Sequence, residues 1–92
     1  MADIFDEHLV PSTDAVESAV GDETVILHLK SGTYFGLDAV GTRIWAMVKD
    51  GVATADIAKC LTEEFDVTQA IAEADARRFI GELKANDILI NG

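Results

Sequence analysis

The sequence predicts an α+β fold in which a three-stranded antiparallel sheet is followed by a bundle of three helices. Residues 15–37 contain three short stretches of β-forming residues, separated by the tight-turn sequences "GDET" and "SGT". Residues 39–85 then carry apolar side chains at helical spacing, with breaks at Gly51 and at "DVT". Strands grouped before helices favour an arrangement in which the helices pack on one face of the sheet.

The strand region reads as a meander. The expected strands are residues 15–20, 24–30 and 33–37. The second is the clearest: its odd-numbered residues form one face, and Ile26, His28 and Lys30 form the other. We interpret the second face as the polar one and therefore expect His28 on the surface. The third strand, "TYFGL", leads directly into the first helix. Residues 1–14 are expected to form a flexible N-terminal arm, and residues 15–92 the domain proper.

Capping residues mark the starts of the three helices. The expected helices cover residues 39–49, 55–65 and 69–85, with N-caps at Asp38, Thr54 and Thr68. Gly51 ends the first helix, because glycine accepts the left-handed conformation that follows a helix. The third helix has an apolar stripe that we assign to the core: Ala72, Ala76, Phe79, Ile80 and Leu83. Residues 88–90 are expected either to lie against the helices or to form a short strand.

Composition limits the classes of function. The chain has 92 residues and a formal net charge of -10, from 17 acidic and 7 basic side chains. Such a charge opposes binding to nucleic acid, whose phosphates are also negative. The N-terminus lacks the features of a secretory signal, and no apolar run approaches the length of a membrane-spanning helix. We therefore expect a soluble cytoplasmic protein with no nucleic-acid or membrane partner.

No group of residues in the sequence suggests catalysis. His8 and His28 are far apart, and Cys60 is the single cysteine, so neither a zinc site nor a nucleophile with its base is indicated. The glycine pairs around Gly36 lack the remaining residues of a phosphate-binding loop. We expect a binding protein rather than an enzyme, with no catalytic residue, metal or cofactor.

The third strand is the strongest candidate for a binding site. It lies at an edge of the meander, and "TYFGL" contains neither a charge nor a proline to block the pairing of another strand. The third helix offers a second wall, through a flank of residues beside its apolar stripe: Ile71, Asp75, Arg78 and Glu82. The simpler explanation of these charges is mutual ion pairing along the helix surface. If the helix face that borders the third strand is displaced by one stripe, it contains Arg77 and Gly81 instead.

At this point the order and spacing of the motifs resemble the PqqD family. The matching elements are Leu37-Asp38, Gly41, Ile44-Trp45, Gly51 and residues 54–57, 61–67 and 75–83. The resemblance covers residues 9–91. Asp38 stands where asparagine is more usual in the family, and both residues can cap a helix.

The resemblance implies a winged-helix-like domain that acts as a RiPP recognition element. Such a domain binds the leader of a ribosomally synthesised precursor peptide and delivers it to a protease, cyclase or radical SAM enzyme, as in lasso peptide or pyrroloquinoline quinone (PQQ) pathways. The leader is expected to add as a strand to the third strand and to lie against the third helix. The implied peptide-binding residues are Thr33, Tyr34, Phe35, Gly36, Ile71, Asp75, Arg78 and Glu82.

Two other classes of function remain open from the sequence. A winged-helix DNA-binding protein shares the expected fold, although it normally presents a basic recognition face that this chain lacks. A dimeric accessory subunit of an enzyme would use the same unblocked edge to pair with a second copy of the chain.

Overall fold

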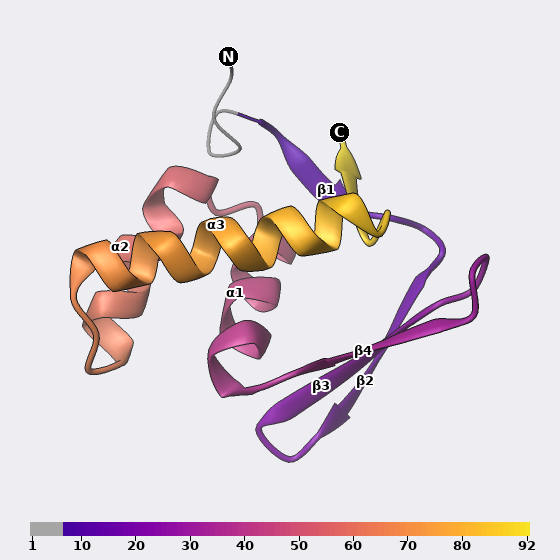
Figure 1. The fold of residues 1–92 in the computed structure, drawn as a ribbon, viewed down its shortest axis with the longest axis horizontal. Helices are drawn as coiled ribbons and strands as arrows, with labels where there is room; N and C mark the ends of the chain where they lie inside the picture. The colour runs from indigo at the N-terminus through magenta and orange to yellow at the C-terminus, as the bar shows by residue number, and fades with distance from the viewer. Residues whose placement is uncertain (1–6) are drawn as a thin grey trace.

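The computed structural model describes residues 7–92, which form an α+β fold with a three-stranded sheet, a two-stranded sheet and three helices, as expected for a winged-helix-like domain (Figure 1). The elements in chain order are β1 (Leu9–Pro11), β2 (Ala15–Val20), β3 (Glu23–His28), β4 (Thr33–Leu37), α1 (Ala39–Lys49), α2 (Thr54–Glu64), α3 (Gln69–Ala85) and β5 (Leu89–Asn91). The larger sheet has the order β2-β3-β4, so β2 and β4 are its two edges.

Tight turns set the register of the larger sheet. β2 pairs antiparallel with β3 from Ala15↔His28 to Val20↔Glu23, and β3 pairs with β4 from Thr24↔Leu37 to His28↔Thr33. Gly21 and Gly32 have φ values of +64° and +70° in the two turns, a conformation that favours glycine. The meander predicted from the sequence is therefore confirmed.

The prediction that His28 lies on the surface is wrong. Ile26 and His28 share the face of β3 that packs on the helices, and both side chains are buried. The His28 Nδ1 atom lies 3.3 Å from both the backbone nitrogen and the Oγ atom of Ser31, so the ring closes the turn between β3 and β4. The residues on the outward face include Val25, Leu27 and Leu29, so here the more apolar face of the strand is the one turned away from the helices.

Part of the expected N-terminal arm belongs to the folded domain. Leu9–Pro11 forms β1, which pairs antiparallel with β5, and the Leu9 side chain is only 5% exposed. Glu7 forms an ion pair with Lys84 of α3. The expectation of a flexible arm therefore does not hold for residues 9–11, and its first six residues lie outside the described part of the chain. The C-terminal residues were expected either to lie against the helices or to form a short strand, and β5 is such a strand.

Two of the three predicted N-caps are present. The Asp38 Oδ1 atom accepts a 2.8 Å hydrogen bond from the Gly41 backbone N–H, and the Thr68 hydroxyl accepts one of 3.3 Å from Ile71. The predicted cap at Thr54 is wrong. α2 begins at Thr54 itself, its N-cap is Ala53, and the buried Thr54 side chain lies within the first turn.

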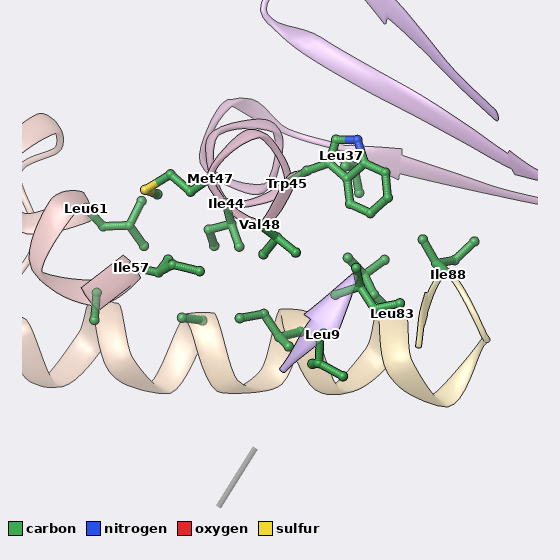
Figure 2. Packing of buried hydrophobic residues seen from close by; sticks show 14 of the residues in the cluster. Leu9, Leu37, Ile44, Trp45, Met47, Val48, Ile57, Leu61, Leu83 and Ile88 are labelled. Carbon is green, nitrogen blue, oxygen red and sulfur yellow. The ribbon is translucent and has the colours of Figure 1, made fainter. Parts of the chain in front are cut away.

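Helix α1 forms the centre of the core. Its side chains Ile44 and Val48 point toward α3, while Met47 approaches Leu61 of α2 (Figure 2). Trp45 lies beside Leu37, the last residue of β4, and so joins the helices to the sheet (Figure 2). This packing fixes the position of β4 relative to α3. Within residues 7–92, no helix is long and apolar enough to cross a membrane.

Candidate functional site

The edge strand β4 presents backbone groups that have no partner strand among the described residues. The Leu29 backbone N–H donates to the Asp14 carbonyl (2.9 Å), which continues the β2–β3 ladder. It follows that every second residue of β3, counted back from Leu29, forms its backbone hydrogen bonds with β2. The residues between them, including His28 and Ile26, therefore bond to β4. Their partners on β4 are Thr33, Phe35 and Leu37. The N–H and C=O groups of Tyr34 and Gly36 therefore point away from β3, out of the open edge of the sheet.

Helix α3 lies opposite this edge (Figure 1), and side chains of β4 and α3 line a groove between the two elements. We define the strand hollow as the cavity of about 230 Å³ lined by Phe35, Gly36, Leu37, Asp38, Phe79, Glu82 and Leu83. We define the cap hollow as the adjoining cavity of about 160 Å³ lined by Asp38, Val40, Gly41, Ile44, Asp75, Arg78 and Phe79. The two hollows share the lining residues Asp38 and Phe79, so they adjoin along β4, the start of α1 and α3, and together we call them the groove.

The structure places the four predicted helix residues on the same side of α3. Asp75 and Arg78 line the cap hollow, and Glu82 lines the strand hollow. Ile71 lines neither, but its side chain is 53% exposed one turn before Asp75. The alternative stripe with Arg77 and Gly81 lines neither hollow.

The four predicted strand residues divide between the groove and the outer surface. Phe35 is half-buried against the core and lines the strand hollow together with Gly36. Tyr34 points to the outer face of the sheet and is 69% exposed. Thr33 pairs with His28 at the start of β4 and lines neither hollow. The strand therefore contributes both side chains and free backbone groups to the site.

Two residues that line both hollows, Phe79 and Asp38, were not among the predicted site residues. Phe79 belongs to the apolar stripe of α3 and was assigned to the core, yet its half-buried ring lines both hollows. Asp38 was predicted only as a helix cap, but it also borders both hollows. In the sequence, Phe79 stands at the margin of the apolar stripe, next to the flank with Asp75 and Glu82, but a fully enclosed ring would occupy the same position.

Acidic groups predominate along the groove. Asp38, Asp75 and Glu82 face a single basic side chain, Arg78, which gives a formal net charge of -2. The Asp38 carboxylate is occupied by its cap hydrogen bond. Asp75 Oδ1 lies 3.7 Å from Arg78 Nη2 in a solvent-exposed pair, which is worth little energy. The Glu82 carboxylate has no ion pair or hydrogen bond within the described part of the chain.

The other candidate reactive groups lie outside this groove. His28 is buried beneath the sheet, and Cys60 is a half-buried free thiol on α2. Among residues 7–92, no three histidine, cysteine or acidic side chains are grouped so that they could hold a metal ion. The geometry thus offers a groove with apolar walls and acidic groups along it, beside an unpaired strand edge, which suits an extended peptide.

Comparisons with known proteins agree with this architecture. Residues 23–89 match the family model for coenzyme PQQ synthesis protein D (PqqD). The solved structure "TbiB1 in Complex with the TbiA(beta) Leader Peptide" is 39% identical, with a TM-score of 0.80, covering 86% of this chain and 92% of the other. The structure "Lasso peptide synthetase B1 complexed with the leader peptide" is 26% identical, with a TM-score of 0.82, covering 90% and 98%. No curated protein sequence matches the chain.

Proposed function

The chain belongs to the PqqD family, and we propose from this premise that it binds the leader region of a ribosomally synthesised precursor peptide. Two structures similar to it along most of their length contain a leader peptide, as their names state. The observation that carries the proposal is the groove lined by β4 and α3 together with the unpaired backbone groups along the outer edge of β4. A peptide that adds as a fourth strand satisfies those groups and enters the groove at the same time.

Each part of the site has a separate role in this binding. The backbones of Tyr34 and Gly36 exchange hydrogen bonds with the leader, and these bonds do not depend on the leader's sequence. Phe35 and the α3 residues contact the leader side chains that point into the groove. The proposed peptide-binding set remains Thr33, Tyr34, Phe35, Gly36, Ile71, Asp75, Arg78 and Glu82.

We propose that the protein itself is not catalytic and presents the precursor to a modifying enzyme. The groups that line the groove support this role, because the Asp38 carboxylate caps α1 and Asp75 pairs with Arg78. The groove contains neither a nucleophile beside a base nor a pair of carboxylates separated from other charges. Strand addition leaves the part of the precursor beyond the leader free for the enzyme. The similarity to lasso peptide synthetase B1 favours a precursor of the lasso peptide type.

Direct titration tests the proposal. The first step is to search the neighbourhood of the gene for a short precursor peptide, and a fluorescein-labelled form of its leader is then titrated with the full chain and followed by fluorescence anisotropy. We expect saturable binding, and a leader of scrambled sequence serves as the control. A flat titration with the cognate leader would contradict the proposed function. Saturation by the scrambled control at the same concentration would show that the groove does not read the leader's sequence.

A further inference from the structure

The strand hollow combines an apolar wall with one charged group. Phe35, Leu37, Phe79 and Leu83 contribute the apolar side chains, and Glu82 contributes a carboxylate from the exposed side of α3. This combination suits a long side chain that is apolar along its stem and positively charged at its end. A purely apolar side chain entering the hollow would leave the carboxylate with water as its only partner.

Neither of the two basic side chains nearest to Glu82 along α3 pairs with it. Arg78 lies 3.7 Å from Asp75, and Lys84 forms its ion pair with Glu7 on another side of the helix. The groove carries a formal net charge of -2 within a chain of -10, so its field attracts a cation and repels an anion. The partner that Glu82 lacks within the described residues is thus best supplied by the ligand.

Resting on the function proposed above, we propose that the leader carries a lysine or arginine whose side chain enters the strand hollow and pairs with Glu82. The aliphatic stem covers the rings of Phe35 and Phe79, and the cationic end reaches the carboxylate at the rim. Because side chains alternate along a strand, the basic residue is separated by an even number of positions from the apolar residues of the leader that also face α3. Side chains between them face the same side as Tyr34 and make no contact with Glu82.

A random 12-residue peptide display library, selected on the immobilised full chain, tests this charge preference without knowledge of the precursor. The same selection is run on Glu82→Gln and on Glu63→Gln. Glu63 is exposed on α2 and lines neither hollow, so its replacement removes the same charge away from the groove. In the selected peptides, we expect lysine and arginine to be enriched over aspartate and glutamate at positions two residues away from an apolar residue. The enrichment is expected to persist with Glu63→Gln and to disappear with Glu82→Gln.

One selected peptide then gives a quantitative cycle. Replacing its basic residue by norleucine keeps the apolar stem and removes the charge. For a largely exposed ion pair, we expect this change to weaken binding to the wild type and to Glu63→Gln by about two- to fivefold. The same change is expected to have no effect with Glu82→Gln, because the partner charge is then absent.

The outcomes separate the inference from the function on which it rests. Selected peptides that bind β4 without a basic residue, or whose basic preference survives Glu82→Gln, would overturn the inference and leave the proposed function standing. A selection that yields no saturably binding peptide, together with a flat titration of the cognate leader, would count against both.

Discussion

The ring of Phe79 lies so close to the backbone of Gly41 that a Cβ atom placed on Gly41 would be 3.0 Å from the ring's Cε2 atom. Gly41 is a buried residue of α1, and Phe79 is the α3 residue shared by both hollows of the groove. Glycine destabilises a helix, so its presence at position 41 needs a structural reason. Because Gly41 has no side chain, α1 and α3 can approach closely and the Phe79 ring can occupy its position. Gly36 also borders the groove, but a Cβ atom there would meet nothing within 4 Å.

The first prediction concerns this contact. Gly41→Ala is expected to displace the Phe79 ring toward the groove and to weaken leader binding by about fivefold, the equivalent of about 1 kcal/mol of overpacking strain. Its effect on folding is expected to stay within about 1 kcal/mol, because the higher helix propensity of alanine offsets the crowding. Anisotropy and urea unfolding measure the two effects. Adding Phe79→Leu removes the crowded ring atoms, so the binding penalty of Gly41→Ala should shrink in that background. An unchanged affinity in Gly41→Ala would show that the ring position does not matter.

The second prediction compares two prolines on β4. Tyr34→Pro removes an N–H that points away from the sheet, so it is expected to leave the fold intact and to weaken leader binding by about tenfold or more. Phe35→Pro is the matched control: it removes an N–H of the ladder to β3 and should lower the midpoint of unfolding. Circular dichroism and anisotropy separate the two results. Equal loss of stability in both variants would mean that the assignment of outward groups on β4 is wrong.

The third prediction tests whether β1 belongs to the fold. Leu9→Ala is expected to lower the free energy of unfolding by about 2–5 kcal/mol, as for other buried leucines. Ile90→Ala changes the neighbouring strand at a position that is 41% exposed, and is expected to cost about 0.5 kcal/mol or less. Trp45, the only tryptophan, is buried in the core, so its fluorescence reports urea unfolding. A Leu9→Ala variant as stable as the wild type would mean that β1 does not pack on the core in solution.

The fourth prediction concerns pH. Hydrogen bonds from Lys84 and then Asn91 hold the pKa of the Glu7 carboxyl below its ordinary value of 4.5. Because the folded-state pKa is the lower one, the contacts stabilise the fold above the unfolded pKa, and this contribution disappears as the pH falls through the folded pKa. Glu7→Gln is therefore expected to lower Tm near neutral pH, and the difference from the wild type should vanish in acid. A difference that stays constant down to acidic pH would mean that the charge of Glu7 is not responsible.

The sequence predicted features that depend on neighbouring residues. Asp38 and Thr68 were identified as caps because a cap requires only a short polar side chain and the N–H groups that follow it. β4 and α1 were predicted with the bounds that the structure has, because turns and caps define them locally.

Features that depend on distant packing were missed. Alternation shows that Ile26 and His28 share a face, but only the position of α1 decides that this face is buried. β1 requires a partner about 80 residues away, so no local pattern reveals it. Phe79 was assigned to the core because its place in the stripe is the same whether its ring is enclosed or borders a groove.

The central claim is that a leader adds as a strand to β4, and amide hydrogen exchange at that strand tests it most directly. In the free protein, the amides of Tyr34 and Gly36 should exchange quickly, while those of Phe35 and Leu37 are protected by the ladder to β3. Saturating cognate leader should slow exchange at Tyr34 and Gly36. Exchange at these two amides that is unchanged by a leader known to be bound would contradict strand addition to β4.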